Sequence, residues 1–170
     1  MTDENPYSAP AASLDTGVTE LYEPTIFSFN GRLGRLRYLA YSIGLMFLLM
    51  LVMMPIMGLS GFMAGDGGMS VLAIVAIIAF YAVATVLSVM FGKRRLNDLN
   101  RNGWWLLLSL VPFVNLLLGI YMFFFPGSED SNEYGSPPVA NTLGVKILAL
   151  IFPVIMLIGI AAAIILPMMQ

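Results

Sequence analysis

The residues best suited to chemistry lie in one short stretch, FGKRRLNDLNRNGWW, at positions 91–105. It holds four of the chain's eight basic residues, together with Asp98 and two tryptophans. Guanidinium groups bind phosphates and carboxylates through parallel hydrogen bonds. Asp98 lies three or four residues from neighbouring arginines, a spacing that allows ion pairs along a helix. The stretch therefore predicts an anion site, a charge cluster braced by Asp98, or both.

A second basic segment, with Arg32, Arg35 and Arg37, precedes the first apolar run. We expect bases of both segments to form one cytoplasmic patch that holds an anionic lipid headgroup or a phosphate-bearing ligand. Each base near an anionic leaflet contributes about 1 kcal/mol, so adhesion without a pocket is the simpler alternative. The residues proposed for the headgroup are Arg32, Arg35, Arg94, Arg95, Asp98 and Arg101.

Membrane topology alone also accounts for much of this stretch. Basic residues keep a loop on the inner side, and tryptophans and tyrosines favour the headgroup level. We expect Trp104, Trp105 and Tyr134 to be interface anchors.

The chain contains no cysteine and no histidine. Cysteine nucleophiles, disulfides, Ser-His-Asp triads and zinc sites built on these residues are therefore excluded. The thirteen methionines are better explained by helix packing than by soft-metal binding. We expect no enzymatic activity, no catalytic residues, no metal or cofactor, and no nucleic-acid partner.

The elements that must position these residues are apolar. The chain is 59% apolar and 11% charged, whereas soluble proteins are about a quarter charged. Apolar runs of 22 residues cover positions 38–59, 70–91, 104–125 and 145–166. A helix of that length measures about 33 Å, enough for a hydrocarbon core of about 30 Å. The sequence predicts an all-α integral membrane fold with four transmembrane helices.

The third run allows two interpretations. Pro112 and Asn115 divide it into pieces that are each too short to span, so a re-entrant hairpin is the alternative to a kinked span. We favour the kinked span, because neighbouring helices can satisfy the carbonyl group that a proline leaves free.

Lysine and arginine counts near the runs predict orientation. Seven bases precede the first run or lie between the second and third, and only Lys146 lies later. The N-terminus and the loop at 92–103 are therefore expected in the cytoplasm. Four spans would return the C-terminus to the cytoplasm, whereas a hairpin would place it outside.

The beginning of the chain differs from the rest. Its first 25 residues hold five acids, three prolines and no base, a composition that cannot bury enough apolar surface to order itself. We expect a disordered cytoplasmic tail at 1–26, a membrane domain with three spans at 27–138, and a fourth transmembrane helix at 139–170. A cleavable signal peptide is not expected.

Three motifs occur together: FSFNGRLGRLRYL at 27–39, RRLNDLNRNGWWLLL at 94–108 and GSEDSNEYGSPP at 127–138. In type, order and spacing they resemble the bacterial inner-membrane family known as domain of unknown function 805. That family usually reads Arg-Arg-Leu-His-Asp where this chain has Asn97. The resemblance implies a small multi-span membrane protein and no established reaction.

We expect a non-enzymatic interaction or accessory component of the bacterial inner membrane. Small residues such as Ser88 and Gly92 favour close packing of helices. We therefore expect self-association or a membrane-protein partner, in addition to contact with the lipid bilayer. The alternative is a small transporter, channel or lipid-handling subunit that acts as an oligomer. The runs lack the ionisable groups at membrane depth that coupled carriers generally need.

Overall fold

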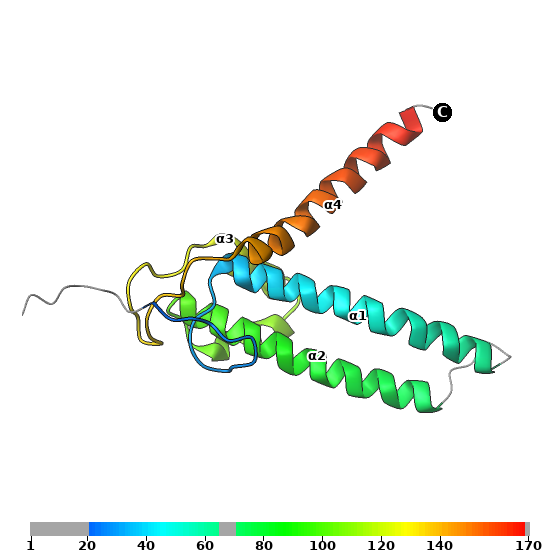
Figure 1. The fold of residues 1–170 in the computed structure, drawn as a ribbon, viewed down its shortest axis with the longest axis horizontal. Coiled ribbons are helices and arrows are strands. Elements are labelled where there is room, and N and C mark those ends of the chain that lie inside the picture. The colour runs from blue at the N-terminus through cyan, green and yellow to red at the C-terminus, as the bar shows by residue number, and fades with distance from the viewer. Residues whose placement is uncertain (1–20, 65–70, 169–170) are drawn as a thin grey trace, which may run out of the picture.

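The computed structural model describes residues 21–64 and 71–168 (Figure 1). Within these ranges the chain is helical and contains no strand, only two isolated β-bridges. This confirms the all-α class. In chain order the elements are α1 (Arg35–Ala64), α2 (Val71–Asp98), the 3₁₀ helix η1 (Gly103–Leu110), α3 (Val114–Phe124) and α4 (Leu143–Met168).

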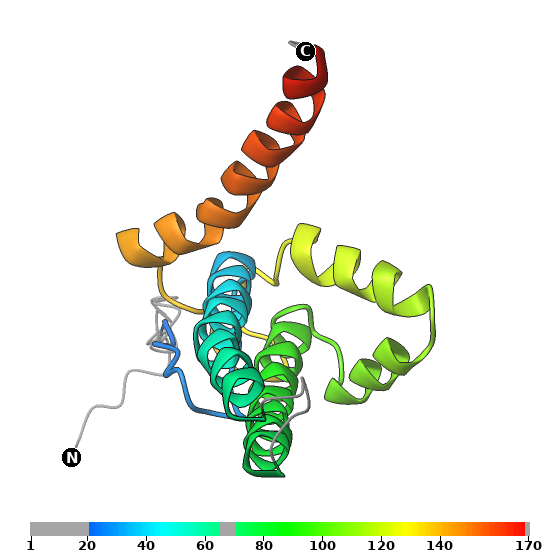
Figure 2. The ribbon, with the colours of Figure 1, turned by 90° about the vertical axis from the view of Figure 1, so that its right-hand side faces the viewer.

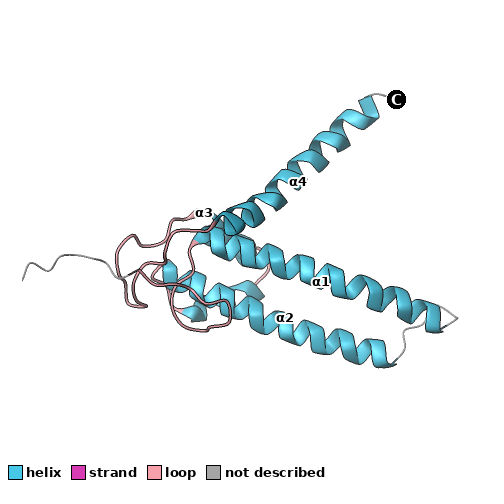
Figure 3. Ribbon diagram, viewed as in Figure 1, coloured by secondary structure: helices cyan, strands magenta, loops and turns pink. Residues whose placement is uncertain are grey.

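The long helices share one end. Figure 1 shows α1 and α2 side by side and antiparallel, with α4 leaving at an angle from the end where α1 begins and α2 stops. Most of the described loops gather at this same end, as Figure 3 shows. We call it the polar end, because it contains the arginines and Asp98 described below.

Three helical segments of the described chain are long and apolar enough to cross a bilayer. They are Arg35–Phe62, Ala73–Asp98 and Leu143–Met168. Most of their large apolar side chains are exposed, including Leu51, Ile78 and Leu157. In a membrane helix such side chains face lipid tails, so exposure here is compatible with a stable fold.

The third apolar run is the main departure from expectation. It forms η1, with 8 residues, and α3, with 11, joined at Val111, Pro112 and Phe113. Phe113 has a φ of 66°, a backbone conformation in which the chain can reverse sharply. At 2.0 and 1.5 Å per residue each arm is about 16 Å long, roughly half of a hydrocarbon core. The third of the four expected transmembrane helices is therefore not found as one span in the described chain, whereas the one expected at 139–170 is present as α4.

Both ends of the third run return to the polar end. Gly103 at its start packs on Lys93 of α2, and the Met122 carbonyl near its finish accepts a hydrogen bond from Arg95. Figure 2 shows η1 and α3 as two arms that project from α2 and fold back. We call residues 103–125 the hairpin. The arrangement matches the hairpin alternative, because arginine side chains hold the far end of the run.

Two further expectations need correction. Helix α2 continues to Asp98, so most of the predicted loop at 92–103 is helical. Tyr22 was expected in a disordered tail, but its N–H donates to the Pro137 carbonyl (2.9 Å) and its own carbonyl accepts from Val139 (2.9 Å). Two backbone hydrogen bonds thus make Tyr22 part of the folded structure. Residues 1–20, which make up most of that tail, lie outside the described chain.

The apolar core at the polar end is small. One cluster contains Leu33, Met90 and Phe91, and joins the segment before α1 to α2. A second joins Leu96 of α2 to two residues of α3, Leu118 and Met122. Gly92, which the sequence suggested for helix packing, lies against Leu106 of the hairpin. These contacts place the ends of α1, α2 and α3 around the arginines.

Candidate functional site: a buried arginine cluster

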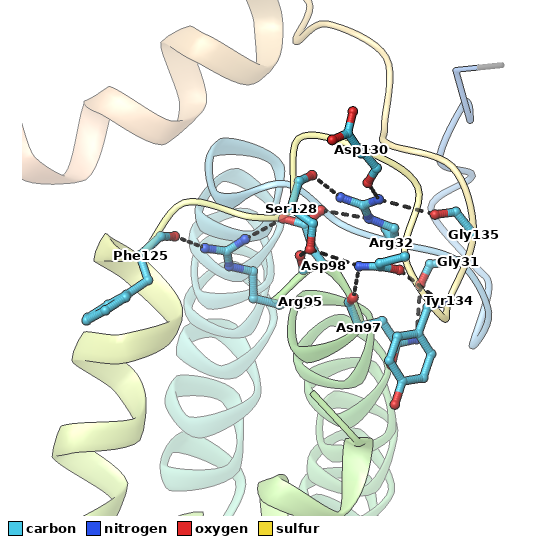
Figure 4. A network of polar contacts seen from close by, with 11 residues as sticks. Gly31, Arg32, Arg95, Asn97, Asp98, Phe125, Ser128, Asp130, Tyr134 and Gly135 are labelled. Atoms are coloured by element: carbon cyan, nitrogen blue, oxygen red, sulfur yellow. Dashed lines mark hydrogen bonds and ion pairs between the residues drawn. The ribbon is translucent and has the colours of Figure 1, made fainter. Parts of the chain in front are cut away.

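Asp98, the last residue of α2, is the centre of the candidate site (Figure 4). Its Oδ1 accepts a hydrogen bond from Arg32 Nε at 3.2 Å, and its Oδ2 accepts from Arg95 Nη1 at 2.6 Å. All three side chains are buried. Of the pairings that helical spacing allowed, the structure contains the one with Arg95, one turn earlier, and Asp98 also pairs with Arg32 from the first motif. We call these three residues the ion-pair cluster.

Arg32 joins the ion-pair cluster to the loop at 126–138. Its Nη1 donates to the carbonyls of Asp130 (2.7 Å) and Gly135 (3.2 Å), and its Nη2 donates to the Ser128 carbonyl. A planar guanidinium with fixed donors suits several carbonyl acceptors at once. One side chain therefore folds the loop over the start of α1.

Arg95 holds the end of the hairpin. Its Nε donates to the Met122 carbonyl at 2.7 Å, and its Nη2 donates to the Phe125 carbonyl. The last carbonyls of an α-helix have no partner within the helix, and a cation near them also interacts favourably with the helix dipole. Arg95 thus caps α3 while its third nitrogen pairs with Asp98.

The end of α2 is capped by the same loop. The Asp98 carbonyl accepts from Ser128 N (2.9 Å) and Ser128 Oγ (3.2 Å), and the Asn97 carbonyl accepts from Asn132 Nδ2 (2.9 Å). Gly127 lies directly against Asp98, so that a Cβ there would overlap the carboxylate. The loop can therefore approach only because this position is glycine.

Asn97, where the resemblance leads us to expect histidine, is 3% exposed. Its Nδ2 donates to the Gly31 carbonyl at 3.1 Å, linking α2 to the first motif. A neutral histidine also has one ring N–H to donate. The geometry therefore gives this position a bridging role that does not depend on a titrating group.

Arg37 and Arg94 are also buried. Neither has a carboxylate partner in the described chain, because both ion pairs there involve Asp98. Arg94 Nη1 donates to the Thr25 carbonyl at 2.7 Å, and Arg37 Nη2 donates to the Ala140 carbonyl at 3.1 Å. Arg94 Nε and Nη2 make no hydrogen bond within the same residues. Arg94 is therefore less fully satisfied than its neighbour Arg95.

The predicted basic patch is divided by this arrangement. Arg32, Arg94 and Arg95 are fully buried and turned toward internal acceptors, so they present no surface to a headgroup. Arg35 and Arg101 are exposed. The sequence could not distinguish these cases, because buried and exposed arginines follow the same pattern of basic residues beside an apolar run.

The predicted interface anchors are placed differently from one another. Trp104 is 73% exposed, and Trp105 lies beneath the Arg101 guanidinium at 5.3 Å from ring centroid to Cζ. Such a cation–π contact stabilises an exposed arginine modestly. Tyr134 is half-buried in the loop, and its N–H donates to Asn132 Oδ1 at 2.9 Å.

Sequence reasoning missed Gly127, Ser128 and the carbonyl acceptors of the loop. Asn132 contacts the end of α2, whereas the Glu133 side chain is exposed. The third motif was the available signal, since Gly, Ser and Asn are typical of turns whose side chains bond to the backbone.

Comparisons with known proteins found one family and two relatives that resemble this chain. A protein family described as "Protein of unknown function (DUF805)" matches residues 26–136, which include the ion-pair cluster, the hairpin and most of the loop at 126–138. The inner membrane protein YhaI of Escherichia coli (strain K12) is 43% identical over 56 residues, covering 32% of this chain and 48% of YhaI. The inner membrane protein YhaH of the same strain is 40% identical over 45 residues, covering 26% of this chain and 37% of YhaH.

The aligned segments thus span about half the length of these relatives or less. No solved structure matches the chain. Both relatives are named as inner membrane proteins, and the three long apolar helices of this chain fit that description. Since the family match covers well over half of its residues, the chain belongs to the DUF805 family of inner-membrane proteins of unknown function.

Proposed function

We propose that this protein is a non-enzymatic accessory component of the inner membrane, in which the ion-pair cluster holds the hairpin at the cytoplasmic side. One observation supports this most directly: every nitrogen of the Arg32 and Arg95 guanidinium groups bonds to an acceptor within the chain. Both oxygens of Asp98 are likewise used. Groups paired in this way stabilise a fold and are not free to activate a substrate.

The proposed orientation follows from the position of the bases. With the third run folded as a hairpin, Lys146 in the first turn of α4 joins the other seven bases at the polar end. Cytoplasmic loops carry an excess of lysine and arginine. The polar end and the N-terminus therefore face the cytoplasm, three helices cross the bilayer, and the C-terminus lies outside.

The surface that interacts with the anionic leaflet consists of the exposed residues of this end. Arg35, Arg101 and Trp104 have the required exposure, whereas the buried arginines do not. Each exposed base contributes about 1 kcal/mol of attraction to anionic lipid. This is enough to hold the polar end at the headgroups and to present it to a partner protein.

Orientation is tested by labelling with cysteine-directed, membrane-impermeant reagents, because the natural chain contains no cysteine. Gln170→Cys should be labelled from outside in spheroplasts, which lack the outer membrane but keep the inner membrane closed. Ser131→Cys, in the loop over the ion-pair cluster, should be labelled only after the inner membrane is opened. If Gln170→Cys is labelled only after the inner membrane of the spheroplasts is opened, the third run spans the bilayer.

The accessory role is tested with purified protein in liposomes. We expect neither solute flux nor lipid scrambling above the level of empty vesicles. Flux of either kind would overturn the proposal in favour of a transporter, channel or lipid-handling subunit. Lipid contact is measured on the same preparation, where Arg35→Gln with Arg101→Gln should lower the anionic fraction of co-purified lipid.

A further inference from the structure

A groove of about 950 Å³ runs between α2 and the hairpin, outside the ion-pair cluster. On the α2 side it is lined by Ala84, Ser88 and Gly92, which are spaced by four and so share one helix face. Leu106 and Leu110 are among the residues that line it on the hairpin side. Gly92 and Leu106 touch and close one part of the groove, while the small side chains of Ala84 and Ser88 leave space beside them for a narrow apolar ligand.

The lining of the groove is mostly apolar, and its polar side chains include Thr85, Ser109 and Asn115. The hydroxyl group of Thr85 donates to the Tyr81 carbonyl at 2.8 Å, and that of Ser109 donates to the Leu106 carbonyl at 2.6 Å. Both hydroxyls are therefore occupied within their own helices. A hydrocarbon chain is the ligand chemistry that such walls suit.

The mouth of the groove has a different chemistry. Lys93 lines it and is half-buried, with its stem so close to Gly103 that a Cβ there would come within 2.9 Å of Lys93 Cγ. In the described chain Lys93 forms no ion pair, since both pairs involve Asp98. Trp104, which is 73% exposed, lines the same mouth. A cation beside a tryptophan at the end of an apolar groove complements a phosphate at the headgroup level.

The dimensions agree with one leaflet of a bilayer. From Tyr81 to Lys93 the groove follows α2 for twelve residues, about 18 Å at 1.5 Å per residue. Half of a hydrocarbon core is about 15 Å thick. A lipid chain that enters at Lys93 would therefore extend along the whole groove within the leaflet.

We infer that this groove binds one anionic glycerophospholipid of the cytoplasmic leaflet, with its phosphate at Lys93 and an acyl chain between α2 and the hairpin. The inference rests on the proposed orientation of the polar end. It does not rest on the surface contact made by Arg35 and Arg101.

The two tryptophans provide the test. In a Trp105→Phe background, Trp104 in the mouth of the groove is the sole tryptophan. Its fluorescence is measured in bilayers that contain small fractions of brominated phosphatidylglycerol or brominated phosphatidylcholine. Both lipids carry a phosphate, but only phosphatidylglycerol has a net negative charge, so one lysine at the headgroup should give about a fivefold preference for it. Equal quenching by the two lipids would overturn the inference.

Two variants separate the headgroup contact from the acyl-chain contact. Lys93→Met keeps the stem and removes the charge, so the fivefold preference should disappear, while Lys146→Met at the same end of the molecule should retain it. Ser88→Leu fills the groove and should lower quenching by both lipids. Ala82→Leu makes a similar change on an exposed part of α2 that does not line the groove, and should leave quenching unchanged.

The remaining outcomes also decide the question. Retention of the preference in Lys93→Met shows that the headgroup assignment is wrong, even if Ser88→Leu fails to fold. Weak quenching by both lipids, combined with disulfide crosslinking of Leu107→Cys chains, assigns the groove to a second copy and overturns the inference. Arg35→Gln with Arg101→Gln should leave the Trp104 preference intact, which distinguishes this site from the surface contact.

Discussion

The polar end and the membrane-crossing helices of this protein are built on opposite principles. At the polar end, charged side chains are buried: Arg32, Arg94 and Arg95 are 0% exposed. In the most apolar stretches of α1, α2 and α4, only 6%, 17% and 6% of the residues, respectively, are buried. Soluble proteins show the reverse, with apolar residues inside and arginine at the surface.

The difference teaches where the specificity of this fold lies. Apolar helices gain little from contacting each other in lipid, because lipid tails are equally apolar. Hydrogen bonds from arginine to main-chain carbonyls have fixed geometry and are costly to leave unmade. The ion-pair cluster should therefore decide the arrangement of the chain, and substitutions there should cost more than substitutions along the helices.

The largest effect is expected from Asp98→Asn. This change leaves Arg32 and Arg95 buried without a counter-charge, which typically costs about 3–5 kcal/mol. Glu133→Gln, an exposed carboxylate of the same end, is the control and should have no measurable effect. Denaturant titration in detergent, followed by tryptophan fluorescence, measures both. Equal stability of the two variants would show that the cluster contributes little.

A second comparison is between adjacent residues. Arg95→Met removes the hydrogen bonds to Met122 and Phe125 as well as one partner of Asp98, and should cost about 2–4 kcal/mol. Arg94→Met removes an arginine with fewer bonds and no carboxylate partner in the described chain, and should cost about 1 kcal/mol or less. The same titration checks the order. A larger loss for Arg94→Met than for Arg95→Met would contradict the order expected from their hydrogen bonds.

Glycine positions give a third test. Gly127→Ala introduces a Cβ that overlaps the Asp98 carboxylate, and should cost about 1–3 kcal/mol because the loop must move. Gly119→Ala is the matched control in α3, where a Cβ meets nothing within 4 Å. It should be neutral or slightly stabilising, because alanine favours the helix. Thermal unfolding in the same detergent should separate the pair.

The smallest effect is expected at Asn97. Asn97→Ala loses the hydrogen bond to the Gly31 carbonyl and should cost about 1 kcal/mol. Asn97→His keeps one N–H donor and should recover part of that loss. If Asn97→His is no more stable than Asn97→Ala, the site requires the amide group and not merely an N–H donor.

Part of this structure was predictable from sequence for a simple reason. The three long helices are continuous apolar runs, and length alone is enough to identify them. The Arg95–Asp98 pair follows from helical spacing, because residues three apart lie on one face. Both signals are local and need no knowledge of the tertiary fold.

The rest depended on contacts between distant segments. Hydropathy gave the third run the same pattern as the others, and Pro112 showed where it breaks without showing which way it continues. That direction depends on Arg95 meeting the carbonyls of Met122 and Phe125. Carbonyl groups occur at every residue, so no side-chain pattern marks the ones that bind an arginine.

The hydrogen bonds from Arg32 to the loop at 126–138 also affect the order in which the chain folds during synthesis. Arg32 binds the carbonyls of Asp130 and Gly135, which follow it by 98 and 103 residues. At about 5–20 residues per second, ribosomes need about 5–20 s to synthesise that stretch. Throughout this interval Arg32 exists without the loop that encloses it, and its partner Asp98, which follows it by 66 residues, is made only in the last third. The loop therefore closes over the ion-pair cluster only late in synthesis, and a chain that ends near residue 126 would hold its hairpin through Arg95 alone.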